Sequence, residues 1–434
     1  MRKVFLGYVD ISKNLYYLSL GLKELGYDVW LFNYQNKSTK SILNKLFIRY
    51  LNKKSIPQSK IIDLLNKTKY FIIRLLIFLN ILLFRKVIII SFSGTLFNYR
   101  ELFWFRVFKK KIIYWFHGSD SRPPYINKVY KVKLNSKQEF DNLLLKTKQI
   151  YLNIKKIEKQ VKYIVCPISH AHFFEKKVID PIFIGKPFHF NEVLIKKDKK
   201  LFPEGIGLKI LHAPSKKDVK GSNIIREIIS NIQNSGFQIN FYEITSAQHS
   251  TVLQLICESD LVIDQLYSDI PIPSITKEAG FLGTPVVLSG YFMEVYDKKI
   301  FEKYLPPVYY CKPEELETTL RHLLNNRKEL VEMRQKIKNF FFERFNSVNV
   351  ANNFISLFDD NFFNQISLNP LDFSYTSGCG YSKSEVKNLI NQFVKFYEKD
   401  SLLIHHNKVL SKAFLKEITN NDQNPNLISP LPPR

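Results

Sequence analysis

The hydrophobic and polar positions at the start of the chain alternate between strand-like and helix-like patterns. The apolar run VFLGYV opens the sequence, and Leu15, Leu18, Leu22 and Leu25 then recur three or four residues apart until Gly26. The β-branched and aromatic run DVWLFNY comes next. This order predicts a β-α-β unit at the start of a doubly wound sheet.

A basic stretch at residues 36–86 interrupts the alternation and predicts two helices separated around Pro57. Its cations alternate with Leu, Ile and Phe, which suits either an amphipathic helix packed on the first sheet or a helix lying on an anionic membrane surface. The most apolar part, residues 70–84, contains Arg74 and is shorter than the roughly 20 residues that a spanning helix needs. We therefore expect a buried or interfacial helix and no transmembrane anchor.

The strand-helix alternation resumes after this stretch and continues to about residue 290. Strands separated by helices predict mostly parallel sheets. In the second half, Ser222 is the expected N-cap of a helix with one isoleucine stripe. The expected strands are residues 87–92, 111–116, 163–169, 208–213, 238–244, 260–264 and 285–289.

The length of 434 residues suits two domains of ordinary size. We expect α/β architecture with an N-terminal Rossmann-like domain at 1–190, which carries the basic helical insertion 36–86, and a C-terminal Rossmann-like domain at 191–365. A helical extension and a disordered tail fill residues 366–434. Such a fold holds its ligand in the cleft between the two domains.

The composition adds a strong positive charge to this picture. The net charge is +25, from 64 Lys and Arg against 39 Asp and Glu, and a basic surface attracts phosphates, anionic lipid or nucleic acid. A compositional bias of the source genome would explain the many scattered lysines equally well. Because the cations alternate with aliphatic rather than aromatic side chains, we expect no nucleic-acid partner.

The cysteines and the N-terminus indicate the cellular compartment of the protein. The four cysteines lie far apart without a CxxC pair, which argues against a zinc site and a disulfide framework. The first apolar run is soon broken by Asp10, too early for a signal peptide. We expect a cytoplasmic protein, with peripheral attachment to the membrane if the basic stretch binds lipid.

The loop from His212 to Gly221 is the first candidate site. It places Ser215, Lys216 and Lys220 before a helix N-terminus, where backbone N–H groups, the helix dipole and cations together suit a diphosphate. The Walker A order is absent, and a lysine pair in a surface loop is also compatible with simple solvation.

Glu278, in the segment KEAGFLG, is the second candidate. We expect it near the start of a helix that follows a strand, where a carboxylate can accept two hydrogen bonds from a ribose diol. A favourable contact with the helix dipole is the alternative.

The third candidate is the polar loop HGSDSRPPY, which directly follows the apolar strand 111–116. Gly118 would let the backbone approach a ligand, while His117 and Asp120 would orient sugar hydroxyls or move a proton. His170 and His172 are two residues apart, a spacing that does not favour a metal pair on a helix.

These segments in this order resemble the GT-B glycosyltransferases of the family-four or group-one type. The resemblance rests on LKILHAPSKKDVKG, DLVIDQLYSDIPIPSITKEAGFLGTPVV and PPVYYCKPEELETTLRHLL. It implies that residues 191–365 bind a nucleotide-sugar donor, with Lys220, Gly221, Ser215 and Lys216 at its pyrophosphate and Glu278 at its ribose. His117 and Gly118 would then face the transferred sugar.

Two departures from the family pattern stand out. The second acidic residue of the usual glutamate pair would occupy position 270, but Ile270 stands there and Asp269 is one step away. The usual Arg after the first strand of the donor domain is also missing, so the resemblance leaves charge compensation to lysines.

The resemblance implies metal-independent and retaining transfer to a saccharide or lipid-linked acceptor of the lipopolysaccharide or capsule type, with no cofactor besides the donor substrate. The sequence leaves two alternatives open. One is an enzyme similar to a nucleotide-sugar epimerase on the same fold, and the other is a basic membrane-binding protein without catalysis.

Overall fold

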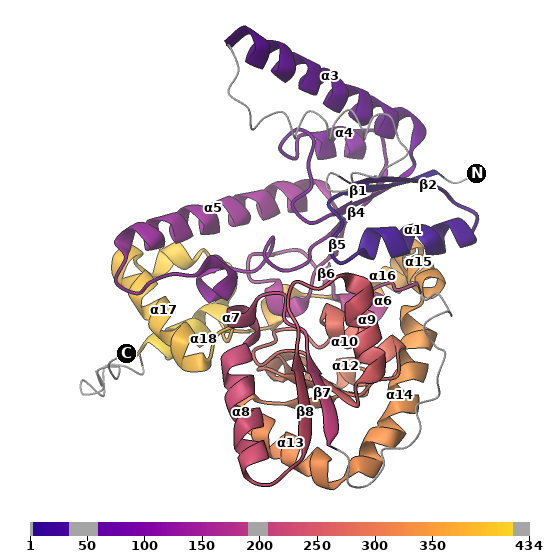
Figure 1. Ribbon diagram of the computed structural model, residues 1–434. Helices are drawn as coiled ribbons and strands as arrows, with labels where there is room; N and C mark the ends of the chain where they lie inside the picture. The colour runs from indigo at the N-terminus through magenta and orange to yellow at the C-terminus, as the bar shows by residue number, and fades with distance from the viewer. Residues whose placement is uncertain (1–2, 34–59, 190–206, 420–434) are drawn as a thin grey trace.

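The computed structural model describes residues 3–33, 60–189 and 207–419. Within them the chain builds two sheets surrounded by helices (Figure 1). The first sheet has the order β12-β6-β5-β4-β3-β1-β2, and the second has the order β11-β10-β9-β7-β8. The predicted α/β class with two Rossmann-like sheets is confirmed.

The first sheet is parallel except at one edge, where β12 runs antiparallel to β6. Its interior strand β3 is buried along its whole length, as expected for a parallel sheet covered on both faces. Its strands are Lys3–Tyr8 (β1), Asp28–Asn33 (β2), Val87–Ser91 (β3), Lys111–Trp115 (β4), Tyr163–Val165 (β5), Val178–Ile179 (β6) and Ser367–Leu368 (β12).

The helices of this half only partly match the expected pattern. The first expected helix of the basic stretch lies outside the described residues, whereas the second is present as α3. Helix α4 starts at Glu101, whose carboxylate accepts hydrogen bonds from the backbone N–H groups of Leu96 and Phe97 in the preceding loop. The helices are Asn14–Glu24 (α1), Lys60–Phe84 (α3), Glu101–Val107 (α4), Lys137–Gln160 (α5) and Pro181–Ile184 (α6), with short 3-10 turns at Pro124–Ile126 (η1), Lys128–Tyr130 (η2) and Ile168–His170 (η3).

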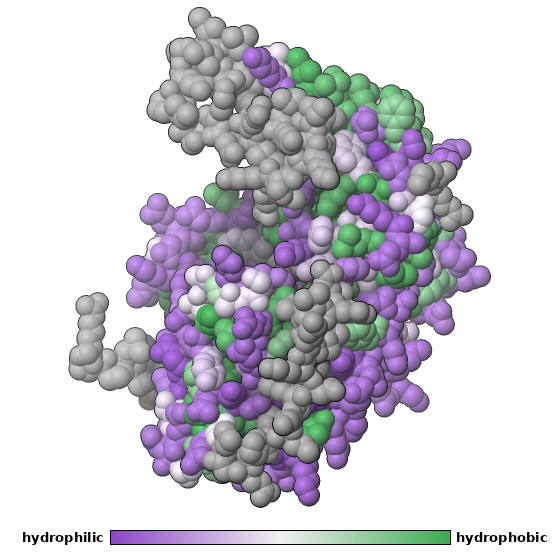
Figure 2. All heavy atoms as spheres, turned by 45° about the vertical axis from the view of Figure 1, so that its right-hand side comes forward, coloured by the Kyte–Doolittle hydropathy of each residue, from purple (hydrophilic) through white to green (hydrophobic). Residues whose placement is uncertain are grey.

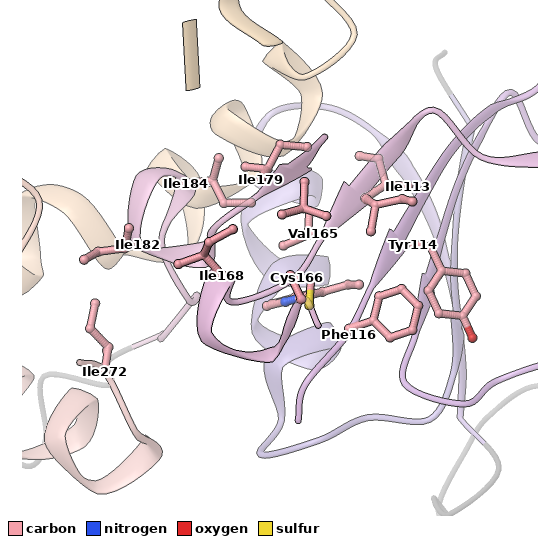
Figure 3. Close-up of a cluster of buried hydrophobic side chains, with 14 of the residues drawn as sticks. Ile113, Tyr114, Phe116, Val165, Cys166, Ile168, Ile179, Ile182, Ile184 and Ile272 are labelled. Atoms are coloured by element: carbon pink, nitrogen blue, oxygen red, sulfur yellow. The ribbon is translucent and has the colours of Figure 1, made fainter. Parts of the chain in front are cut away.

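A core cluster lies where β4, β5 and β6 run side by side (Figure 3). Ile113, Val165 and Ile179 are fully buried, and Phe116 extends the cluster past the end of β4. Because apolar burial stabilises by about 25 cal/mol per Å², this packing fixes the chain from which the HGSDSR loop starts.

The second sheet is entirely parallel. Its strands are Leu208–His212 (β7), Ile239–Glu243 (β8), Leu261–Ile263 (β9), Val286–Ser289 (β10) and Tyr309–Cys311 (β11). Its helices are Lys217–Lys220 (α7), Ser222–Asn234 (α8), His249–Glu258 (α9), Ser274–Phe281 (α10), Met293–Tyr296 (α11), Lys299–Glu302 (α12), Leu316–Asn325 (α13) and Arg327–Phe345 (α14), with a 3-10 turn at Pro313–Glu315 (η5).

Helix α8 corrects one expectation. Its N-cap is Gly221 rather than Ser222, and Gly221 has a left-handed φ of 72°. A Cβ there would lie 2.6 Å from the Cβ of Leu266, so the turn requires glycine. Ser222 is buried and its hydroxyl lies 2.8 Å from His212 Nε2, which ties the start of α8 to β7.

After α14 the chain returns to the first sheet. Helix α15 (Ser347–Ser356) packs on α1 so closely that a Cβ on Gly21 would lie 1.9 Å from the carbonyl oxygen of Ser347. Helix α16 (Asp360–Ile366) then leads into β12. The boundaries at residues 190 and 365 remain predictions, but these contacts place the segment 347–366 beside the N-terminal sheet.

The C-terminal extension lies against the N-terminal half, near α5 (Figure 1). Phe393 of the extension packs on Tyr125 with ring centroids 5.4 Å apart, and Phe396 packs on Phe140 at 5.3 Å. The expected disordered tail, residues 421–434, lies outside the described residues. The extension comprises Pro370–Asp372 (η6), Lys383–Tyr397 (α17), Lys399–Leu402 (η7) and Lys408–Thr419 (α18).

Candidate functional site

A pocket of about 470 Å³ lies between the carboxyl ends of the two sheets. Loops that follow β7, β8 and β9 form most of it, and Ser12, which follows β1, closes it from the first sheet. Ligands of doubly wound proteins bind at this end of the strands. The pocket brings together Ser215, Lys220 and Glu278 of the predicted site residues.

Helix α10, which lines this pocket, is positioned by a buried carboxylate. The side chain of Asp264, just after β9, accepts hydrogen bonds from the N–H and the hydroxyl of Thr276 at 2.9 and 2.7 Å. This fixes the first turn of α10 and brings Ser274 and Ile275 to the pocket wall. The N-cap residue Pro273 makes no side-chain cap, and a helix start carries N–H groups and a positive dipole that attract an anion.

Lys220 ends α7 and reaches towards the same helix start. Its ammonium contacts Gln265 and lies 3.7 Å from Asp264 Oδ1. Lys216 is exposed and lies outside the pocket lining, as does Gly221, whose role here is the tight turn already described. The roles expected of these residues in donor binding remain predictions.

Glu278 lies in the middle of α10, at the fifth residue rather than at its start. Its side chain is buried to 6% exposure, and Oε1 lies 2.9 Å from Nε2 of His249. Lys13 Nζ lies 3.5 Å from the other ring nitrogen of that histidine. A chain of three polar groups therefore crosses the cleft from the first half of the protein to Glu278.

The loop after β1 is bent sharply where it meets the pocket. Ser12 and Lys13 both have positive φ, at 52° and 57°, although neither is glycine. Ser12 Oγ lies 3.0 Å from Ser274 Oγ across the cleft. Non-glycine residues in this region store backbone strain that is typical of functional sites.

The HGSDSR loop lies deeper and is largely satisfied within the protein. His117 Nε2 lies 2.8 Å from Ser91 Oγ. Asp120 Oδ1 accepts the backbone N–H groups of His117 and Gly118 at 3.0 and 2.9 Å. The loop thus curls around its own carboxylate, and Gly118 takes a φ of 143° that favours glycine.

Burial shifts the protonation of both predicted catalytic residues. It lowers the pKa of His117 to about 3, and Lys186 and Lys277 add to that effect. It raises the pKa of Asp120 to about 6, against the lowering effect of the two backbone hydrogen bonds. At neutral pH His117 is therefore a neutral imidazole, and Asp120 is ionised. Their catalytic roles remain predictions.

Arg122 of the same loop makes a buried ion pair across the cleft with Asp269. His170 Nε2 lies 2.8 Å from both the guanidinium and Asp269 Oδ2. Burial opposes the charge on Asp269, but Arg122 and His170 hold the pKa of its carboxyl below the ordinary range. Asp269, the acid one step from the usual family position, is thus engaged by the first half of the protein.

Two lysines behind the pocket were not anticipated. Lys277 donates to Asn14 Oδ1 and to the Pro187 carbonyl, each at 3.2 Å, and Lys186 donates to the Ile272 carbonyl at 2.6 Å. Burial lowers the pKa of each ammonium to about 8. Both therefore add positive charge near the cleft at neutral pH.

His249 was also missed by the sequence analysis. The signal was present, since SAQHS is a polar segment between a strand and a helix. In the part of the chain that the structure describes, no group of three or more His, Cys, Asp or Glu residues is arranged to hold a metal ion. His170 contacts Asp269, whereas His172 Nε2 lies 2.6 Å from the Tyr375 carbonyl.

Comparison with known proteins finds no matching family model and no matching curated protein. Solved structures do match. A glycosyltransferase from Rickettsia africae is 12% identical with a TM-score of 0.50, over 83% of this chain and 98% of that one. Sucrose-phosphate synthase from Thermosynechococcus elongatus is 12% identical with a TM-score of 0.48, over 84% and 100%.

HepE from Anabaena, in complex with UDP, is 12% identical with a TM-score of 0.43, over 82% of this chain and 99% of that one. At such low identity these matches bear on the fold alone. Two Rossmann-like sheets, a cleft between them and the match to the Rickettsia protein over nearly its full length agree. The chain therefore has the GT-B glycosyltransferase fold.

Proposed function

We propose that the protein transfers a sugar from a nucleotide-sugar donor to a hydroxyl group of a saccharide or lipid-linked acceptor. The observation that carries this proposal is the pocket between the two sheets, which combines Glu278, Lys220 and the start of α10. A carboxylate, a cation and a helix N-terminus are the groups that a ribose and a diphosphate need.

We assign these residues the following roles. Glu278 accepts hydrogen bonds from the ribose, while Lys220, with Ser215, and the start of α10 hold the diphosphate. His117 and Gly118 face the transferred sugar. Lys186 and Lys277 strengthen the positive field behind the pocket, which stabilises the negative charge that develops on the leaving group.

The acceptor hydroxyl oxygen forms a bond to the anomeric carbon as the bond from that carbon to the diphosphate oxygen breaks. The hydroxyl proton passes to the departing nucleoside diphosphate. We propose that lysines and the helix dipole neutralise this leaving group without a metal ion and that the anomeric configuration is retained. Full activity in EDTA and an NMR assignment of the product anomer test these two points.

Thermal-shift measurements with UDP, GDP, CDP and ADP, free and as nucleotide sugars, test the donor site. A ligand at about 100 times its dissociation constant stabilises a protein by about 2.7 kcal/mol. One nucleotide should stabilise the wild type and Lys209→Ala, which alters an exposed lysine near the start of β7 and outside the pocket, but not Glu278→Ala or Lys220→Ala. Equal responses in all four proteins would overturn the donor site.

Turnover then separates the proposed transfer from the alternative similar to an epimerase. A transferase gives a product only when an acceptor is present, whereas an epimerase converts the donor without one. Donor conversion that is unchanged by removal of every acceptor would favour the epimerase.

A membrane surface is the second partner that we propose. Apolar side chains are exposed on α3 and α4, and Figure 2 shows green, hydrophobic atoms over α3 at the upper end of the molecule. Arg106 in α4 and Lys109, two residues after its end, are exposed next to these apolar residues, and such a mixture suits anionic headgroups. The exposed apolar residues are Phe71, Ile72, Leu75, Leu76, Leu79, Leu83, Phe84, Phe103, Trp104, Val107 and Phe108.

No helix among the described residues is long and apolar enough to span a bilayer. Sedimentation with phosphatidylglycerol vesicles tests surface binding, with phosphatidylcholine vesicles as the reference. Trp104→Glu and Phe108→Glu should each reduce binding to the anionic vesicles about tenfold, because they remove apolar burial and add repulsion. Tyr242→Glu, at an exposed position on β8, is the matched control.

A further inference from the structure

A second pocket of about 560 Å³ lies beside the proposed donor site and is formed by three parts of the chain. Lys128 and Lys131 come from the first half, and Tyr267 comes from the loop after β9. The C-terminal extension contributes Tyr381 and Glu385. The sequence suggested no chemical role for the extension, but the extension forms part of the wall of this pocket.

The extension is held in the cleft by backbone contacts with both halves. Cys379 donates its N–H to the Ile126 carbonyl at 2.9 Å and accepts the N–H of Lys128 at 3.0 Å. Gly380 donates to the Tyr267 carbonyl at 3.1 Å. A Cβ on Gly378 would lie 2.2 Å from the Ile126 carbonyl oxygen, so this close approach requires glycine. The wall is built into the fold.

The lining combines aromatic and charged groups. Lys128 pairs with Glu385 at 3.0 Å, and Lys131 pairs with Asp218. Burial, followed by the nearby Glu385 carboxylate, raises the pKa of both Tyr267 and Tyr381 to about 12. The tyrosine hydroxyls thus remain protonated donors. Aromatic rings suit the C–H face of a sugar, and alternating donors and acceptors suit its hydroxyls.

The pocket also lies next to the proposed reaction centre. Lys220 lines the donor pocket, and the next residue, Gly221, lines this one. Tyr130 donates its hydroxyl hydrogen to the Ser119 carbonyl at 3.2 Å, which ties the wall near Lys128 to the HGSDSR loop. The two pockets therefore flank the same turn between α7 and α8.

We propose that this second pocket is the acceptor subsite, that it binds a saccharide, and that Tyr381 and Glu385 of the C-terminal extension form part of it. This inference rests on the proposed glycosyl transfer. It assigns the extension the task of closing the subsite against Tyr267 and the start of α8.

The test uses the full chain, the donor selected by thermal shift with its sugar radiolabelled, and the lipid and polysaccharide extract of the source cells as acceptor. Asn223→Trp fills the pocket from an exposed position on α8, and Ser230→Trp adds the same ring to the same helix outside the pocket. Tyr381→Ala removes one aromatic wall. Label in the extract measures transfer, and free labelled sugar measures donor hydrolysis.

We expect Asn223→Trp and Tyr381→Ala to lower transfer at least about tenfold, which corresponds to about 1.4 kcal/mol of lost binding. Hydrolysis and nucleotide stabilisation should stay at wild-type levels, as should all activities of Ser230→Trp. Wild-type transfer by Asn223→Trp would overturn the acceptor subsite alone. A wild-type protein that neither binds nucleotide nor transfers label would instead overturn the proposed function, and this subsite with it.

Discussion

The two candidate loops at the carboxyl ends of the sheets differ in how far they are closed. The HGSDSR loop after β4 is packed around Asp120, whereas the donor pocket after β7 and β9 is open and exposes Ser215 at its rim. Both occupy the position at which α/β proteins bind ligands. The same topological position therefore holds a closed, internally bonded loop in one half and an open pocket in the other.

The two regions should therefore differ in whether a substitution changes the free energy of unfolding or the affinity for nucleotide. Charges in the closed loop are removed from water and depend on partners within the protein, so losing a partner destabilises the fold. At the open pocket Glu278 is buried, but Lys220 remains partly exposed, so a ligand can reach it. Substitutions in the first region should mainly change unfolding, and substitutions in the second should mainly change nucleotide affinity.

The largest effect is expected for Arg122→Ala. It leaves Asp269 buried without its cationic partner, which typically costs about 3 to 5 kcal/mol. Urea unfolding measures the loss. Lys162→Ala is the control, because it removes a partner of Asp360 from an exposed pair and should cost less than about 1 kcal/mol. Equal losses in the two variants would contradict the distinction between the loops.

A pH effect on nucleotide affinity should come next. Lys186 and Lys277 have pKa values of about 8, so both lose positive charge as pH rises through that value. Affinity for the selected nucleoside diphosphate should fall about tenfold between roughly pH 7 and 9, if each lost charge removes about 0.7 kcal/mol of attraction. Titration calorimetry measures this change. Lys277→Met should bind less tightly at pH 7 and show a shallower fall.

The fold could be predicted further than the site. Strand-helix periodicity identified both sheets, because burial on parallel strands leaves uninterrupted apolar runs such as VIIIS. The return of α15 to α1 was not visible, since it depends on a close backbone approach at Gly21 rather than on periodicity.

The sequence placed Lys220 in the loop after β7 and Glu278 near the start of the helix after β9, and the structure brings both residues to one pocket. Their roles in donor binding remain predictions. The sequence could not predict contacts that depend on packing between distant segments. Nothing in the local sequence pairs Arg122 with Asp269 or brings Tyr381 next to Tyr267. Lys277 also stands beside Glu278 in the sequence, but helical geometry sends its side chain to Asn14 and Pro187.

His249→Ala should have a smaller effect on the open pocket. The ring of His249 positions Glu278 through the contact at 2.9 Å, and one such hydrogen bond contributes about 1 kcal/mol. Nucleotide affinity should therefore fall about fivefold with little change in unfolding. His322→Ala, which removes an exposed histidine paired with Glu329 at the same distance, is the matched control and should bind nucleotide normally.

Asp120→Asn should have the smallest effect at neutral pH. The amide oxygen can still accept the N–H groups of His117 and Gly118, and the benefit of removing a buried charge is offset by an amide NH₂ placed where Asp120 Oδ2 has no partner among the described residues. We expect a change in unfolding free energy below about 1 kcal/mol.

The pH profile distinguishes this variant from a silent substitution. The folded pKa of Asp120 is about 6, above its ordinary value of 3.8, so the folded protein binds the extra proton between these values. The stability of the wild type relative to Asp120→Asn should therefore decrease as pH rises from about 4 to 6 and stay constant above that. Urea unfolding across this range measures the difference. A relative stability that increases with pH would mean that Asp120 is held as a stabilised carboxylate, and the closed loop would then resemble the open pocket in relying on charge.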